Sequence, residues 1–373
     1  MNPFQLTGYH GPELFCDREE ETEKLYNAID NERNVTLTSI RKMGKSGLIK
    51  HVLHKLKANK KAYSVYYLDI YHTENLSNFL EVFGKELMNN HSNFPQKIRN
   101  LFENFIKSLN PTISFDPLSG KQNLSFNFNS NVNKEQSIIG IFDILSKISA
   151  TKKVVIAIDE FQQIAKYPEK NVEALLRGVI QSLKNINFIF SGSDTSMMTE
   201  IFNDSKRPFY QSTQLMHLSH IPYDKYSEFI NHHFESNKRH IEQQAVDFIL
   251  NETRIHTYYV QFLCNRAFAS KKKKINLNDI KLLYSEILQE NEAYYSTYKD
   301  MLSTQQWKLL IALANEGGFA SVTSGDFIRN YNLSNASTIR RSVKSLLQKQ
   351  MIFKKDNSYF VYDVFFARWL TRL

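Results

Sequence analysis

This sequence has little cysteine and no long apolar run, and both absences restrict what the protein can be. Cys16 and Cys264 are its only two cysteines in 373 residues. Two thiols so far apart argue against a disulfide framework, which favours a reducing, cytoplasmic setting. Two cysteines also exclude a zinc site built from cysteines. No segment approaches the roughly 18 apolar residues that a membrane span needs, and no signal-peptide pattern opens the chain, so we expect neither membrane insertion nor secretion.

Acidic residues are also scarce relative to basic ones. The chain carries 47 Lys and Arg against 38 Asp and Glu, for a net charge of +9. The excess is concentrated in residues 296–373, which hold 11 basic and 5 acidic side chains. A basic terminal module suggests a polyanionic partner such as nucleic acid, although a solvated surface explains the charge equally well.

Apolar runs alternate with helical patterns over residues 1–222, which is typical of a parallel α/β sheet. Prolines and glycine at 110–133 interrupt this alternation and predict an inserted hairpin or loop. At about 100–200 residues per domain, the chain should hold two or three domains, and we assign residues 1–222 to the first. The five predicted strands lie within residues 35–40, 62–70, 152–159, 185–194 and 213–221.

The remaining chain divides into two smaller domains. Residues 223–295 show helical spacing with no convincing strand, so we predict a helical domain. Residues 296–373 contain three helical segments, one of which ends at Gly317-Gly318, followed by alternating residues around a turn at Asp356-Asn357. Three helices followed by a hairpin indicate a winged helix-turn-helix domain.

The most informative stretch is "NVTLTSIRKMGKSGLIKHVLHKL", residues 34–56. A β-branched run leads into Gly44-Lys45-Ser46 and at once into a helical pattern, which indicates a phosphate-binding loop rather than a coincidental turn. In such a loop Lys45 reaches the β- and γ-phosphates and Ser46 offers its hydroxyl to Mg2+. Ser39 stands where the pattern G-x-x-x-x-G-K-[ST] has its first glycine. The predicted nucleotide-binding residues here are Ser39, Ile40, Arg41, Lys42, Met43, Gly44, Lys45, Ser46 and Gly47.

Two further strands end in polar residues. "VVIAIDEF" ends in Asp159 and Glu160, for which the alternative interpretation is a plain turn with solvated acids. In a phosphoryl-transfer site the first acid holds the metal through water and the second activates the attacking water. We therefore assign Asp159 to Mg2+ and Glu160 to the general base. "FIFSGSD" brings Ser191 or Ser193 within reach of the γ-phosphate as a sensor, and Ser191 is the catalytic candidate together with Glu160 and Lys45.

These stretches, in this order, resemble the archaeal-type ATPases of the AAA+ class, which are close to the STAND NTPases. The resemblance implies a P-loop NTPase three-layer sandwich with a five-stranded parallel sheet, in which the strand ending at Ser191 lies between the loop strand and the acid strand. It also implies a helical lid, a C-terminal winged helix, and nucleotide contacts from Arg18 near the adenine and from Tyr258 in the lid. The matching segments are "LFCDREEETEKL", "SIRKMGKSGLI", "VVIAIDEFQQI", "FIFSGSDTSMM", "KRPFYQSTQLMHLSHI", "RIHTYYVQFLCNRA" and "YFVYDVFFARWLTRL".

The chain departs from the family pattern outside the loop as well. Asp17 stands where a glycine is usual, and the lid's Gly-His-Pro-type turn is "IHT" at residues 255–257. The family's Gly-Arg, whose arginine is a candidate for the γ-phosphate, is "QS" at residues 211–212. Arg207 is the nearest substitute, with a surface role as the competing interpretation. Without a positioned arginine we expect slow ATP hydrolysis, because such a charge is worth orders of magnitude in rate.

The predicted winged helix carries candidate DNA contacts. Thr338, Arg340, Arg341 and Lys344 lie on its third helix, and Lys354 begins the wing. A third helix of this kind can enter the major groove while the wing touches phosphates. The competing interpretation is a module that packs against the other domains or docks a protein.

Together these patterns predict a cytoplasmic AAA+ ATPase that binds ATP and Mg2+, hydrolyses ATP slowly and works as a nucleotide-dependent switch. Two alternatives stay open: a DNA-binding winged-helix regulator with a structural nucleotide, and a signalling scaffold whose winged helix docks a protein partner. The sequence names neither the process nor the partner. The oligomeric state is also open, because the arginine that would act across subunits is missing.

Overall fold

The chain folds into two compact units, one of residues 7–219 and one of residues 2–6 and 220–373. Residues 2–6 thus belong to the second unit, whereas the sequence placed them with the first. The predicted boundary between a lid and a winged helix falls inside the second unit. The computed structural model describes residues 2–58, 62–90, 92, 94–109, 111–115, 122–126 and 133–373.

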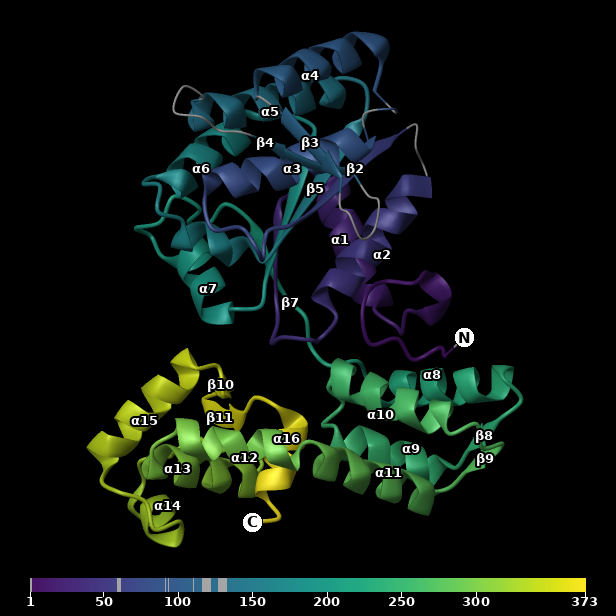
Figure 1. Cartoon of the computed structure of the whole chain (residues 1–373), viewed down its shortest axis with the longest axis vertical. Helices are drawn as coiled ribbons and strands as arrows, with labels where there is room; N and C mark the ends of the chain where they lie inside the picture. The colour runs from purple at the N-terminus through teal and green to yellow at the C-terminus, as the bar shows by residue number, and fades with distance from the viewer. Residues whose placement is uncertain are drawn as a thin grey trace. The chain divides into compact units, whose positions relative to one another are not determined.

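A five-stranded parallel sheet with the order β2-β5-β6-β1-β7 forms the centre of the first unit (Figure 1). The strand that contains Ser191, β6, lies between β1 and β5, so the implied strand order is confirmed. In a parallel sheet of this kind ligands bind beyond the carboxyl ends of the strands, where the connections diverge to opposite faces. The strands are β1 (Val35–Thr38), β2 (Tyr63–Asp69), β5 (Lys153–Asp159), β6 (Ile186–Gly192) and β7 (Gln214–His217).

Helices cover both faces of the sheet, which makes the unit a three-layer sandwich. Alternate residues of β5 divide between two hydrophobic clusters: Val155 and Ala157 pack with α1 and α2, while Ile156 and Ile158 pack with α3 to α7. This division follows from the two-residue period of a strand. The helices are α1 (Glu19–Asp30), α2 (Lys45–Ala58), α3 (Leu76–Asn90), α4 (Gln96–Ser108), α5 (Lys134–Ser149), α6 (Val172–Ser182) and α7 (Thr195–Asn203), with 3-10 turns at Pro12–Leu14 and Phe161–Lys166.

The inserted hairpin is confirmed where the structure describes it. Strand β3 (Pro111–Phe115) pairs antiparallel with β4 (Gln122–Phe126). Within the predicted insertion, residues 110, 116–121 and 127–132 lie outside the described residues.

The lid half of the second unit is mainly helical, as predicted, with one correction. Strand β8 (His240–Ile241) pairs in parallel with β9 (Lys274–Ile275), and two residues are too short a run to show a strand pattern in sequence. Phe4 is fully buried here against rings of Phe229, Phe234 and Phe268. The helices are α8 (Tyr223–Ser236), α9 (Gln243–Glu252), α10 (Thr257–Ala269) and α11 (Leu277–Glu290).

The C-terminal half of the second unit has the predicted winged-helix elements. Asp356 and Asn357 both adopt positive φ in the turn of the wing, which suits a two-residue hairpin. Asn335 caps the third helix by accepting a hydrogen bond from the backbone N–H of Thr338. The elements are α12 (Glu292–Met301), α13 (Thr304–Asn315), α14 (Gly325–Asn330), α15 (Ala336–Gln348), β10 (Ile352–Lys355), β11 (Ser358–Val361) and α16 (Val364–Leu370).

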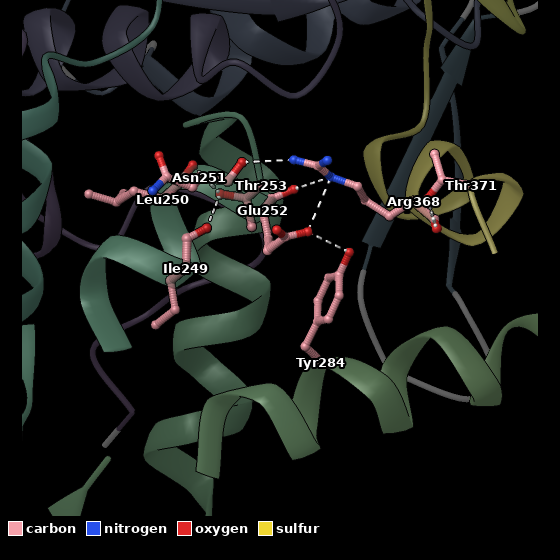
Figure 2. A network of polar contacts seen from close by, with 8 residues as sticks. All are labelled: Ile249, Leu250, Asn251, Glu252, Thr253, Tyr284, Arg368 and Thr371. Atoms are coloured by element: carbon pink, nitrogen blue, oxygen red, sulfur yellow. Dashed lines mark hydrogen bonds and ion pairs between the residues drawn. The ribbon is translucent and has the colours of Figure 1, made fainter. Parts of the chain in front are cut away.

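Figure 2 shows how the lid and the winged helix are joined within this unit. The guanidinium of Arg368 donates to the backbone carbonyls of Glu252, at 3.2 Å, and Asn251, at 3.0 Å, at the C-terminal end of α9. It also forms an ion pair with the Glu252 carboxylate, which accepts from the hydroxyl of Tyr284 at 2.9 Å. A cation at the C-terminus of a helix satisfies otherwise unpaired carbonyls and complements the helix dipole. Phe365 adds a ring contact with Tyr284, with ring centres 6.2 Å apart.

The turn after α13 yields a stability prediction. Gly318 has φ +118°, and a Cβ there would lie 2.0 Å from the ring of Phe360 on β11. Gly318→Ala therefore adds both a backbone strain and a clash, and we expect it to lower the free energy of unfolding of the second unit by about 3 kcal/mol. Scanning calorimetry measures this.

The matched control for that substitution is Gly325→Ala, in the same half of the unit. Its added Cβ would meet only the flexible guanidinium of Arg329, at 3.4 Å. We expect a change within about 0.5 kcal/mol for the control. Equal unfolding temperatures for the two variants would contradict this account of the turn.

Candidate functional site

The loop between β1 and α2 folds around the side chain of Lys45. Lys45 is only 5% exposed, and its Nζ donates to the backbone carbonyl of Ser39 at 3.2 Å and to the Ser39 hydroxyl at 3.1 Å. Lys42 and Gly44 adopt positive φ, which turns the chain tightly before the helix begins. The serine that replaces the first glycine of the pattern is thus a hydrogen-bond partner of the lysine, which the pattern alone did not reveal.

Charge and burial act against each other at Lys45. Burial lowers the pKa of its ammonium group from the ordinary value. The negative charges of Asp159 and Glu160 raise this pKa, whereas the positive charge of Arg41 lowers it further. The predicted loop cations and the predicted acids are therefore close enough to interact. An anion brought to this loop would favour the charged form of Lys45.

Asp159 ends β5 directly beside the start of α2. Its Oδ2 accepts from the hydroxyl of Ser46 at 2.5 Å, and its Oδ1 accepts from the hydroxyl of Ser191 and from the backbone N–H of Glu160, the latter at 3.1 Å. Ser46 comes from the loop helix, Ser191 from the end of β6. The structure thus brings together Ser46, Asp159, Glu160 and Ser191, which were predicted from three separate segments of the sequence.

Glu160 is fixed by two neighbours. It adopts left-handed φ at +58°, and its Oε2 accepts from the amide of Gln162 at 2.5 Å and from the hydroxyl of Ser193 at 2.8 Å. Gln162 approaches so closely that a Cβ on Gly192 would lie 2.3 Å from its Oε1. Ser193 was predicted only as an alternative sensor. Gln162 was not predicted, although its position two residues after Glu160 could have indicated it.

Tyr67 on β2 is the other polar partner that the sequence did not reveal. Its hydroxyl donates to Asp159 Oδ2 at 2.7 Å, and Lys50 Nζ lies 4.6 Å from the centre of its ring. Burial, together with the nearby charge of Asp159, raises the pKa of the Tyr67 hydroxyl above its usual value, so the group carries its proton at neutral pH.

The segment before α1 is tied to the loop. Arg18, 3% exposed, donates to the Glu21 carboxylate at 2.7 Å and approaches the backbone carbonyl of Met43 at 3.5 Å. Asp17 has φ +53°, which explains why a glycine is usual at this position. Phe15 stacks on the imidazole of His51 with ring centres 4.3 Å apart.

Two predicted residues are not part of this cluster. Arg207 forms ion pairs with Glu173 at 3.3 Å and Glu200 at 3.6 Å, so we do not assign it to the phosphates. Tyr258 lies at the start of α10 in the second unit, where its ring contacts Tyr259. Its contact with a nucleotide stays a prediction.

The candidate DNA contacts lie as predicted on one helix and one strand of the winged helix. Arg340, Arg341 and Lys344 are exposed on α15, whose buried residues include Ile339, Val343 and Leu346. Thr338 is half-buried near the N-terminus of α15, and Lys354 is exposed on β10. Among the helices that the structure describes, none is long and apolar enough to cross a membrane.

Comparisons with known proteins agree with this architecture. A family model described as an ATPase domain predominantly from Archaea matches residues 15–253, and one described as a probable winged helix domain matches residues 293–372. A search of curated proteins finds no match to this chain.

Among solved structures, the chain is similar to the Walker-type ATPase PabY2304 of Pyrococcus abyssi, with 17% identity, a TM-score of 0.68 and coverage of 100% of both chains. It is also similar to the Aeropyrum pernix ORC2 protein in ADPNP–ADP complexes, with 14% identity, a TM-score of 0.61 and coverage of 100% of this chain and 96% of that one. The A. pernix ORC1 protein in complex with DNA gives 11% identity, a TM-score of 0.51 and coverage of 97% and 94%. At these identities the likeness concerns the fold.

Proposed function

This chain belongs to the family of ATPase domains found predominantly in Archaea, and on that premise we propose that it hydrolyses Mg2+-bound ATP slowly at the β1–α2 loop. Nucleotide binding and ATPase activity are properties of the family. The observation that carries the finer proposal is the contact of Ser46 with Asp159, 2.5 Å apart, beside the buried Lys45. A lysine, a hydroxyl and a carboxylate at one loop are what a metal-bound triphosphate requires.

The donor set at this point fits magnesium. Ser46 Oγ and Asp159 Oδ2 are both oxygen donors, which hard divalent cations prefer, and they come from the loop helix and from a strand end. We assign Ser46 to direct contact and Asp159 to contact through water. When bound, Mg2+ would neutralise charge on the β- and γ-phosphates.

Within the proposed reaction the protein groups have separate roles. Lys45 exchanges its contacts with Ser39 for phosphate oxygens and so holds the β- and γ-phosphates. Glu160 accepts a proton from the attacking water, and Ser193 and Gln162 keep its carboxylate in one orientation. Ser191 orients Asp159 from the end of β6.

We expect slow turnover because neither Arg207 nor residues 211–212 supply an arginine for the γ-phosphate. A positioned arginine raises the rate of phosphoryl transfer by about 10³–10⁵. Arg207 is engaged by two glutamates, and residues 211–212 are Gln and Ser. We therefore propose a switch that spends long periods with bound ATP, rather than a fast motor.

The lid and the winged helix share one compact unit, which supports a response to the nucleotide as a single body. The Arg368 contacts and the Phe365 ring packing provide that rigidity. A bound γ-phosphate would shift the protein toward one conformation because it makes extra contacts in that conformation.

The assay that tests this function measures phosphate release from ATP by the purified chain at several protein concentrations, with and without Mg2+ and duplex DNA. We expect slow release that requires Mg2+. A rate of phosphate release per chain that rises with protein concentration would indicate an arginine supplied by a second copy. Failure to bind ATP at micromolar protein and millimolar nucleotide would refute the proposal.

DNA binding is the second candidate function, favoured by the exposed cations of α15 and the wing. The ORC1 protein with the same fold was solved with DNA, but this chain's own surface is what supports the idea. A protein-docking role for the winged helix is the remaining alternative. Gel shifts at two salt concentrations separate the two, because phosphate contacts weaken steeply with salt.

Replacing Arg340 and Arg341 together by alanine tests the DNA interface. We expect duplex affinity to fall at least about tenfold, because hydrogen bonds to charged groups are lost. The slope of log affinity against log salt should become shallower by about 2, one counterion for each lost phosphate contact. Fluorescence anisotropy with a labelled duplex measures both quantities.

The control removes the same charge from the lid. Lys271 and Lys273 are exposed in the loop before β9, so Lys271→Ala with Lys273→Ala changes the net charge equally. If both double variants weaken binding to the same extent, net charge rather than a winged-helix interface governs the interaction.

A further inference from the structure

The hydroxyl of Tyr67 reaches the proposed metal-binding carboxylate from the neighbouring strand. Tyr67 pairs with Ala157 in the register of β2 and β5, two residues before Asp159. Its ring lies on the face of the sheet that α2 covers, under the ammonium group of Lys50 at 4.6 Å. From there the hydroxyl donates to Asp159 Oδ2 at 2.7 Å.

Each oxygen of the Asp159 carboxylate accepts two hydrogen bonds, and the two oxygens differ in what their donors can do. Oδ1 faces the Ser191 hydroxyl and the backbone N–H of Glu160. Oδ2 faces the hydroxyls of Ser46 and Tyr67. Asp159 is 3% exposed, so water contributes little to its orientation.

The two donors on Oδ2 differ in what they would do when a cation binds. A serine hydroxyl binds a cation through an oxygen lone pair and keeps its proton, so Ser46 can contact the metal and still donate to Oδ2. The Tyr67 hydroxyl is assigned no contact with the metal; it donates to Oδ2 from β2 and also lies within hydrogen-bonding reach of Ser46.

We propose that Tyr67 is a positioning residue that holds the carboxylate of Asp159 in the orientation needed to bind Mg2+ with the nucleotide. The inference rests on the proposed function, because it assigns Asp159 to Mg2+. Tyr67 acts through Asp159 and is assigned no contact with the nucleotide. Partners that orient a metal-binding group typically contribute about 10–100-fold to metal affinity.

The competing role for Tyr67 is a purely structural one, in which it fills space and satisfies a buried carboxylate. The two roles differ in their dependence on Mg2+. A positioning role predicts a loss seen only when the cation binds, whereas a structural role predicts equal losses with and without it. The test therefore measures binding in both conditions.

The experiment titrates Mg2+ into the full chain with a fluorescent ATP analogue held at a fixed, subsaturating concentration. For Tyr67→Phe, which keeps the ring under Lys50, we expect the half-saturating Mg2+ concentration to rise by about tenfold. Binding of the analogue in EDTA should stay within about twofold of the parent, a factor below 1 kcal/mol. Tyr67→Leu, which also lacks a donor but packs differently, should show the same shift.

The matched control is Tyr63→Phe, on the same strand. The Tyr63 hydroxyl also donates to a carboxylate, that of Asp30 at 3.1 Å, which is not part of the loop site. This control should leave the Mg2+ titration unchanged.

A double-mutant cycle shows whether Tyr67 acts through Asp159. In an Asp159→Asn background, Tyr67→Phe should add no further shift in the Mg2+ titration. An unchanged titration for Tyr67→Phe, equal losses in EDTA and in Mg2+, or a full additional shift on Asp159→Asn would each overturn the inference. If the parent chain itself bound the analogue without any response to Mg2+, the proposed function would fail together with it.

Discussion

Lys45→Ala is expected to abolish measurable ATP binding while leaving the fold intact. The ammonium group is buried in the loop and would exchange two or more hydrogen bonds with Ser39 and its neighbour for charged phosphate oxygens. Losing charge-assisted bonds of this number weakens affinity by about 100-fold or more. Isothermal titration calorimetry with ATP and Mg2+ provides the measurement.

The control for Lys45 is Lys55→Ala, in the last turn of the same helix. Lys55 is exposed, and its removal changes the net charge by the same amount. We expect its affinity for ATP to stay within about twofold of the parent. A Lys45→Ala variant that binds ATP as tightly as Lys55→Ala would remove the basis for the loop assignment.

Glu160→Gln is expected to separate binding from hydrolysis. The glutamine keeps an acceptor oxygen for Ser193 and for Gln162, so the site should retain its shape and its affinity for ATP. It cannot accept the proton of the attacking water, and a general base typically contributes about 10²–10⁴ in rate. We expect phosphate release to fall by about that factor in a single-turnover assay.

Glu74→Gln serves as the reference for that result. Glu74 is exposed in the turn after β2 and takes no part in the loop site. Its rate of phosphate release should match the parent. Parental turnover in Glu160→Gln would mean that a different group activates water, and Asp159 would be the next residue to examine.

The sequence predicted the loop and the acids because each is a local pattern that has to follow a strand. Glycine, lysine and serine after β1, and two acids after β5, depend on only a few neighbouring residues. The carboxyl ends of parallel strands lie at one edge of a sheet, so Lys45, Asp159 and Ser191 could be expected to meet. The order that makes β1, β6 and β5 neighbours came from the family resemblance, which the structure confirms.

What the sequence missed depends on register and packing between distant segments. Tyr67 reaches Asp159 only because β2 and β5 pair with Tyr67 opposite Ala157, and nothing local to either strand fixes that register. Phe4 had no periodic neighbours to mark it as core, yet it fills a space between lid helices. The engagement of Arg207 depends on how α6 and α7, which carry Glu173 and Glu200, pack beside it.

Ser39 departs from the phosphate-loop motif, yet the loop still holds the ammonium group of Lys45. A glycine there would leave Lys45 with backbone carbonyls alone, whereas the Ser39 hydroxyl adds a side-chain partner and itself donates to the carbonyl of Ile40 at 2.7 Å. Ser39 is fully buried at the end of β1. The loop therefore retains a closed lining around the lysine without the flexibility of a glycine.

A crystal structure of the chain with Mg2+ and a non-hydrolysable ATP analogue tests the central claim most directly. The account predicts one triphosphate at the β1–α2 loop, with Lys45 on its terminal phosphates, the cation between Ser46 and Asp159, and Glu160 facing the γ-phosphate. An analogue bound elsewhere, or bound at the loop with Asp159 and Glu160 turned away from the phosphates, would contradict it.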